Sequence, residues 1–153
     1  STGAHRVAVA NVIPPQAPGA FALDAGLASG HGWCPVDPST FESTRVPDVY
    51  VIGDAAIADA MPKAASSALS QARRCASAIV ARLGGRSVHD TALESVCYSA
   101  LALDRAIAIR GRFRIVGGHI DTDVADAPSP PSRKAGRAAE AWYRSIRKAA
   151  FDA

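Results

Sequence analysis

Apolar side chains recur at helical spacing between residues 66 and 83. They are separated by three- or four-residue steps, with arginines on the remaining faces: Ala68, Ala72, Cys75, Ile79 and Leu83. This pattern predicts an amphipathic helix that begins at a capping serine, either Ser66 or Ser67. Gly84 and Gly85 follow at once, and paired glycines are typical of a helix C-terminus.

Two short apolar runs upstream predict buried strands. Residues 6–13 read Arg-Val-Ala-Val-Ala-Asn-Val-Ile and stop at Pro14-Pro15. Residues 48–52 read Asp-Val-Tyr-Val-Ile and end on Gly53-Asp54. Between them, residues 16–40 are rich in Gly, Pro, Asp and Ser and predict a long loop. Such loops are uncommon in compact domains unless they serve a function.

The pattern changes after Gly85. Alternating runs over residues 95–120 predict an antiparallel meander, with turns at Asp104-Arg105, Gly111 and Gly117-Gly118. Residues 121–132 carry three prolines and predict a linker, after which a final helix is expected. One face of that helix is apolar: Ala135, Ala139, Trp142, Ile146 and Ala149. We therefore expect two domains, 1–84 and 85–153.

Composition excludes several classes of protein. The 153 residues are 48% apolar and 20% charged, which is a globular balance rather than that of a disordered chain. Three cysteines cannot build a disulfide scaffold, and no apolar run reaches the ~18 residues of a membrane span.

The net charge of +3 comes from the end of the chain. Residues 133–153 hold six basic and two acidic side chains, a local charge of +4, whereas the remainder has 11 basic and 12 acidic. No motif accompanies these charges, so we expect no nucleic-acid partner. The histidines lack metal-ligand spacing, and no metal site is predicted.

The dipeptide Gly53-Asp54 is the first candidate for chemistry. A buried strand that ends in Gly-Asp delivers a carboxylate to the strand's C-terminal edge, where open α/β sheets bind ligands. An ionised Asp accepts hydrogen bonds from the hydroxyls of a ribityl or ribose chain, and a following helix N-terminus offers N–H groups to an electron-rich ring edge. The alternative is a plain strand-end turn, because Gly-Asp also favours turns.

The surrounding residues carry a family resemblance. The pattern Thr-x-x-Pro-x-Val-Tyr-x-Ile-Gly-Asp-Ala at 44–55 resembles the second FAD-contacting motif of flavoprotein oxidoreductases with two dinucleotide-binding domains. Further segments, in order along roughly residues 9 to 151, resemble the flavin-binding subunit of flavocytochrome c sulfide dehydrogenase. They are Asn-Val-Ile-Pro-Pro-Gln at 11–16, Gly-Trp-Cys-Pro-Val-Asp at 32–37, Thr-Phe-Glu-Ser at 40–43, Met-Pro-Lys at 61–63, Ser-Val-Cys-Tyr-Ser at 95–99 and Trp-Tyr-Arg at 142–144.

The resemblance implies a periplasmic flavoprotein that oxidises sulfide and passes electrons to a c-type cytochrome subunit. It implies an α/β fold for residues 1–84, the rear of an FAD domain, followed by a small α+β domain formed by the meander and the last helix. Cys34 would be half of a redox disulfide that sulfide opens, and the released thiolate would react with FAD. His31 is a weaker candidate for promoting that thiolate. Cys75, on the apolar face of the predicted helix, and Cys97, in a predicted strand, are interpreted as small buried hydrophobes.

The resemblance also assigns cofactor contacts. Gly53 and Asp54 would hold the ribityl region, and Met61, Pro62 and Lys63 would border the isoalloxazine ring. Lys63 is otherwise interpreted as a solvated surface lysine. Trp142 belongs to the C-terminal region that packs by the flavin, and its alternative role is packing of the last helix on the meander.

The chain departs from the family in two ways. The Gly-x-Gly-x-x-Gly phosphate turn and the second redox cysteine have no counterpart, and Pro-Lys-Ala-Ala at 62–65 stands where relatives read Pro-Lys-Ser-Gly. We expect a C-terminal fragment or truncated product that does not hold FAD tightly alone. Two alternatives remain, a sulfide:quinone-type oxidoreductase and a non-catalytic remnant that acts as a packing or interaction module.

Overall fold

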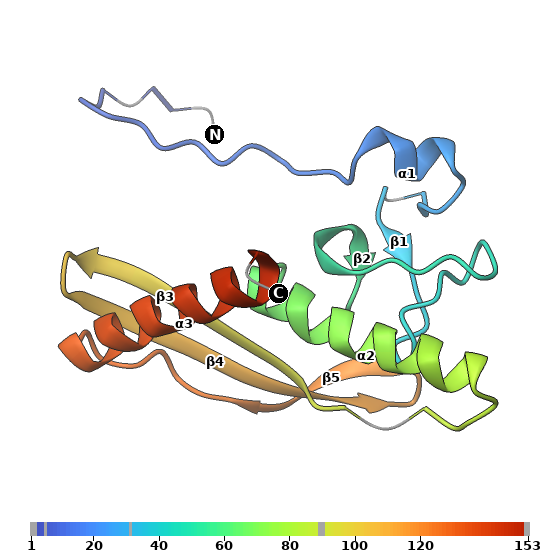
Figure 1. Ribbon diagram of the computed structural model, residues 1–153. Coiled ribbons are helices and arrows are strands. Elements are labelled where there is room, and N and C mark those ends of the chain that lie inside the picture. The colour runs from blue at the N-terminus through green and yellow to red at the C-terminus, as the bar shows by residue number, and fades with distance from the viewer. Residues whose placement is uncertain (1–2, 5, 31, 89–90, 152–153) are drawn as a thin grey trace.

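The computed structural model describes residues 3–4, 6–30, 32–88 and 91–151. The first half contains short elements, α1 (Ala20–Asp24), β1 (Cys34–Pro35), the 3-10 turn η1 (Gly53–Ala55) and β2 (Ala56–Ile57), and then the long helix α2 (Ala65–Leu83). The second half contains β3 (Leu93–Ala102), β4 (Arg105–Val116), β5 (His119–Ala125) and α3 (Arg133–Phe151). The protein is therefore mixed α/β, and the elements of the described residues do not make up a complete FAD-binding domain (Figure 1).

The antiparallel meander is confirmed. Its strands pair in the order β3-β4-β5, and the turns fall near Asp104 and at Gly117-Gly118. The turn predicted at Gly111 is wrong, because Gly111 lies inside β4 and pairs with both Ser95 and Ala125. The Phe113 ring covers the space where a side chain at position 111 would lie. The predicted linker is also shorter than expected, since residues up to Ala125 belong to β5.

Helix α2 is confirmed, and so is its glycine stop. Gly85 has a φ of 61°, and the N–H groups of Gly85 and Arg86 donate to the carbonyls of Arg82 and Ala81. This is the Schellman arrangement of a helix end.

The predicted serine cap of α2 is wrong. Ala64 is the N-cap residue and no side chain caps it. Ser66 bonds to the neighbouring strand instead, and the Ser67 hydroxyl has no hydrogen-bond partner among the described residues. Ser66 Oγ accepts the N–H of Val96, and Ser70 Oγ accepts the N–H of Glu94. β3 is an edge strand of the sheet, so these two hydroxyls satisfy backbone donors that would otherwise have no partner.

The two predicted upstream strands do not form as expected. Residues 6–13 are extended but belong to no strand, and their side chains are exposed, with Val9 at 85%. A strand needs a neighbour for its backbone groups, and within the described residues no other segment pairs with this one (Figure 1).

Residues 48–52 are held by isolated contacts rather than by a ladder. Tyr50 forms a single bridge with Glu42, and the N–H of Val51 donates to the carbonyl of Phe41. The expected parallel sheet is thereby reduced to the two-residue pairing of β1 with β2.

The main core joins both halves of the chain. Phe41, Met61 and Cys75 pack in one cluster with Leu93 and Ile120, which lie on β3 and β5. The predicted boundary at Gly84-Gly85 thus coincides with the end of α2, while the apolar core continues across it.

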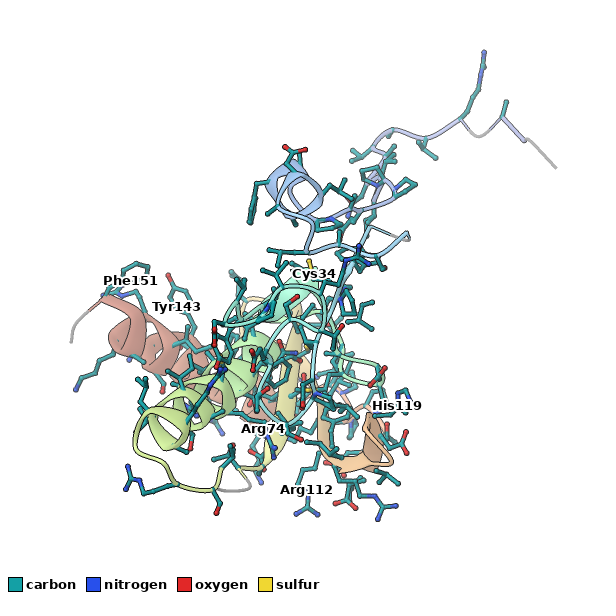
Figure 2. The ribbon with its side chains drawn as sticks, turned by 90° about the vertical axis from the view of Figure 1, so that its right-hand side faces the viewer. Cys34, Arg74, Arg112, His119, Tyr143 and Phe151 are labelled. Atoms are coloured by element: carbon teal, nitrogen blue, oxygen red, sulfur yellow. The ribbon has the colours of Figure 1, made fainter. Side chains whose placement is uncertain are left out.

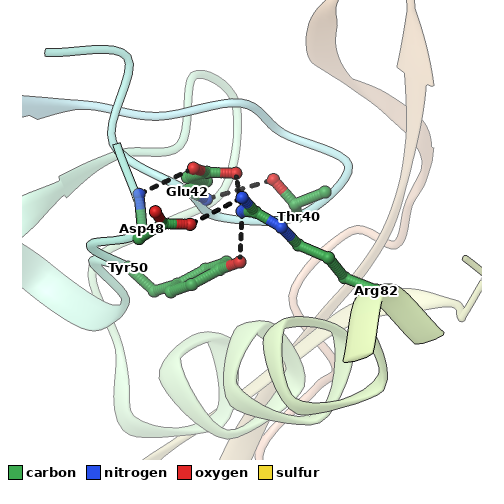
Figure 3. A network of polar contacts seen from close by, with 5 residues as sticks. All are labelled: Thr40, Glu42, Asp48, Tyr50 and Arg82. Carbon is green, nitrogen blue, oxygen red and sulfur yellow. Dashed lines mark hydrogen bonds and ion pairs between the residues drawn. The ribbon is translucent and has the colours of Figure 1, made fainter. Parts of the chain in front are cut away.

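Polar contacts tie the last turns of α2 to the loop that precedes η1. Arg82 donates to Glu42 at 3.1 Å and to the Tyr50 hydroxyl at 3.2 Å, and it pairs with Asp48 at 2.6 Å (Figure 3). These contacts raise the pKa of Arg82, the Tyr50 hydrogen bond most. The hydrogen bond from the Asp48 N–H is the largest cause of a lowered Glu42 pKa. The network therefore holds the segment that leads to Gly53 against the end of α2.

Candidate functional site

Most of the sequence-predicted residues lie around one small cavity. β1 pairs with β2 so that Cys34 lies opposite Ala56, and η1 immediately precedes β2. The cavity has a volume of about 170 Å³ and lies between these elements and the start of α2. Its lining includes Trp33, Gly53, Asp54, Met61, Pro62, Lys63, Ala64, Ser67 and Gln71.

Five of the seven predicted site residues line this cavity directly. These are Gly53, Asp54, Met61, Pro62 and Lys63. Cys34 is next to the cavity through the pairing of β1 with β2 but is not part of its lining. Trp142 is not brought to this site, because α3 places it at a second cavity beside Tyr98.

Lys63 lines the cavity with its ammonium bonded to the main chain, although the residue as a whole is exposed. Its ammonium donates to the carbonyls of Asp54 and Ala56, the latter at 3.2 Å, and lies 3.8 Å from the centroid of the Trp33 ring. Partial burial lowers the pKa of Lys63, while the charges of Asp54 and Cys34 act in the opposite direction. The site therefore holds a fixed cation in contact with an aromatic face.

Cys34 is completely buried. It packs with Ala22, Leu27 and Ala28 in a second apolar cluster, between α1 and the rest of the chain (Figure 2). Burial raises the pKa of its thiol, and the charge of Lys63 partly opposes this. Cys34, Cys75 and Cys97 are all free thiols. Reduced Cys34 thus has the surroundings of a small hydrophobe, and its redox role remains a prediction; His31 lies outside the described residues.

Gly53 has a conformation that few other residues adopt. Its φ is 71°, and its N–H donates at 2.7 Å to Oε1 of Gln71 on α2. Gln71 is only 2% exposed, and its amide nitrogen also lies 3.9 Å from the Met61 sulfur. Sequence reasoning missed Gln71, although a glutamine among the small apolar residues of one helix face was the available signal.

The first turn of α2 faces the cavity without a cap. Ala64 and Ser67 both line the cavity, and within the described part of the chain no side chain caps the helix start. The Ser67 hydroxyl is buried and has no hydrogen-bond partner among the described residues. A helix N-terminus with open donors favours a negatively charged or electron-rich group.

The polar groups at this cavity suit two kinds of ligand group. The exposed carboxylate of Asp54 can accept hydrogen bonds from hydroxyls, whereas the Lys63 ammonium and the uncapped start of α2 suit an anionic or electron-rich group. The volume is smaller than the roughly 300–1,000 Å³ of complete small-molecule sites.

A scan of the chain against models of known protein families finds no match. Among the described helices, none combines the length and apolar character needed to cross a membrane. The described residues also contain no group of three or more His, Cys, Asp or Glu side chains arranged to hold a metal ion.

Proposed function

We propose that this chain forms one wall of the flavin site of a sulfide-oxidising FAD flavoprotein that passes electrons to a c-type cytochrome in the periplasm. The observation that carries the proposal is the meeting of Asp54, Lys63 and the uncapped start of α2 at one cavity beside Cys34. The motif resemblance supplies the substrate and the acceptor. The proposal is supported by five of the matched residues, Gly53, Asp54, Met61, Pro62 and Lys63, which line the same cavity.

Each group has a distinct role in this proposal. Bound FAD would supply a two-electron acceptor. Asp54 accepts hydrogen bonds from ribityl hydroxyls, and the helix N-terminus and Lys63 stabilise negative charge on the ring edge. Gln71 holds the Gly53 N–H and so keeps Asp54 at the cavity.

Cys34 would carry the sulfur chemistry. In its disulfide form, hydrosulfide attacks the sulfur of the partner cysteine, a new S–S bond forms there, and Cys34 leaves as a thiolate with the electron pair of the broken bond. Burial raises the pKa of Cys34, and the positive charge of Lys63 partly opposes this rise and so favours the thiolate as a leaving group.

The test uses a protein in which this chain is joined to, or expressed with, the half that carries the Gly-x-Gly-x-x-Gly turn and the second cysteine. We expect Cys34→Ser to keep bound FAD and to lose bleaching of flavin absorbance by sulfide. Cys75→Ser is the matched control, because Cys75 lies in the core, and it should retain bleaching. Unchanged bleaching in Cys34→Ser would overturn the role of Cys34. Comparing a c-type cytochrome with a soluble quinone as acceptor separates the proposed function from a quinone reductase.

One observation favours a second candidate, a non-catalytic module that retains only the packing of this region. Cys34 is fully buried in an apolar cluster and its pKa is raised, which suits a structural residue. Titration of this chain alone with riboflavin distinguishes the two. The flavin-site proposal predicts weak binding that Asp54→Asn reduces, whereas the packing module predicts no binding to either variant.

A further inference from the structure

A second cavity, larger than the one beside Cys34, is not used by the proposed function. It has a volume of about 560 Å³, within the range of small-molecule sites, and lies between α2, the sheet and α3. Three arginines line it, together with two acidic residues, an aromatic ring and three apolar side chains: Arg73, Arg110, Arg112, Glu94, Asp126, Trp142, Leu69, Val96 and Val124. We call it the sheet cavity.

The register of the sheet explains why these side chains face one space. Glu94 pairs with Arg112, Val96 pairs with Arg110, and Arg112 also pairs with Val124. Paired residues share one face of a sheet, so both arginines of β4 lie on the face that carries Glu94 and Val96.

One end of the sheet cavity is a fixed aromatic wall. The rings of Trp142 and Tyr98 lie 6.0 Å apart, and Arg110 donates to the Tyr98 hydroxyl at 3.0 Å while its guanidinium lies over the same ring. These contacts hold Trp142 in place, and its ring offers a stacking surface for a planar group.

Among the described residues, none of the three arginines of the sheet cavity forms an ion pair, although Glu94 and Asp126 line the same cavity. Arg110 donates to the Tyr98 hydroxyl, which leaves Arg73 and Arg112 as the guanidinium groups open to a ligand. Unpaired guanidinium groups bind carboxylate or phosphate through paired hydrogen bonds. The two carboxylates accept hydrogen bonds from hydroxyl or amino groups, and they make the cavity unsuitable for a long polyanion.

We propose that the sheet cavity binds a small planar aromatic anion that also carries hydrogen-bond donors, of the nucleoside monophosphate type. The ring stacks on Trp142, the acidic group contacts Arg73 and Arg112, and the donors face Glu94 and Asp126. The proposal is independent of the flavin site, since none of its residues lines the cavity beside Cys34.

The experiment is an NMR titration of the whole chain with adenosine monophosphate, adenosine and naphthoate. We expect adenosine monophosphate to shift amides of β3, β4 and the Trp142 turn of α3, and to bind at least about tenfold more tightly than adenosine. Naphthoate, which has an acidic group but no donors, should bind the same place more weakly.

Variants separate this site from a general attraction of anions. Arg112→Gln should weaken adenosine monophosphate binding about tenfold and leave adenosine nearly unchanged. The matched control is Arg114→Gln, on the same strand but outside the cavity lining, where Arg114 lies 3.9 Å from Asp123. Equal weakening by both variants, shifts confined to the cavity beside Cys34, or no shifts at millimolar ligand would each overturn the proposal.

Discussion

The ammonium of Lys63 lies 3.8 Å from the centroid of the Trp33 ring, although thirty positions separate the two residues along the chain. The contact exists because β1, which follows Trp33, pairs in parallel with β2, while Lys63 donates back to the carbonyls of Asp54 in η1 and Ala56 in β2. The cation is thereby fixed beside Cys34, the residue whose pKa it influences.

We expect Lys63→Met to raise the pKa of Cys34 further, because the variant removes the positive charge that opposes the effect of burial. The measurement is the rate of alkylation of Cys34 against pH, with Cys75→Ala and Cys97→Ser present so that only one thiol reacts. The pH midpoint should move upward relative to the protein with Lys63. Lys134→Met, which removes a lysine on α3, is the control and should leave the midpoint unchanged; an equal shift in both would contradict the assignment.

The buried thiols make stability decline in alkaline solution. Burial raises the pKa of Cys34 and of Cys75 in the folded state, so each contributes stability that is complete below the pKa of the unfolded thiol, about 8.5, and is lost as pH rises above it. Lys63 acts in the opposite direction, since its folded-state pKa is lowered.

Cys75 tests this effect without involving Lys63. We expect Cys75→Ala to lower the free energy of unfolding by about 1 kcal/mol at pH 7 through lost packing. The variant should then lose less stability than the parent between neutral and alkaline pH. Denaturant unfolding followed by circular dichroism at several pH values measures both, and parallel pH curves for the two proteins would refute the prediction.

Gln71→Leu should destabilise the protein by about 1–3 kcal/mol, because the Gly53 N–H would lose its acceptor in a partly buried position. Urea unfolding measures the loss. Gln71→Glu is the informative comparison, since it retains an acceptor and should recover part of the stability at low pH, where the new carboxyl is neutral. If Gln71→Leu changes stability no more than a surface substitution, the hydrogen bond to Gly53 does not position η1.

Local sequence patterns predicted the elements whose backbone hydrogen bonds form within one helix or between consecutive strands. The periodicity of α2 and its end at Gly84-Gly85 needed only neighbouring residues, and the alternation over the meander sufficed because sequential strands pair with one another. The serines of α2 show the limit, since Ser66 is typical of a cap but bonds to Val96, which lies thirty positions away.

The missed features depend on distant partners. Residues 6–13 are typical of a strand, yet strand formation needs a neighbour that the local pattern does not specify. For the site, Asp54 and Lys63, which the motifs assign to flavin contact, both line one cavity, and their role there stays a prediction. The motifs could not show that Trp142 lies elsewhere, because the position of α3 depends on how it packs against β4.

The last prediction concerns Gly136, where α3 packs closely against the turn between β3 and β4. A Cβ at this position would overlap the backbone of Asp104 in the turn between β3 and β4, where rigid main-chain atoms leave little room for adjustment. Alanine favours a helix by up to ~1 kcal/mol over glycine, so a free helix would gain from Gly136→Ala. We expect a net loss of about 1–3 kcal/mol instead, because α3 must shift away from the sheet.

The same variant reports on the aromatic wall of the sheet cavity. If α3 moves, the contact between Trp142 and Tyr98 loosens and Trp142 fluorescence should change, which can be read in a Trp33→Phe background. Ala141→Gly is the control, because position 141 is exposed and the substitution should cost only helix propensity. A stabilised Gly136→Ala protein with unchanged Trp142 emission would mean that α3 does not pack closely on this turn in solution.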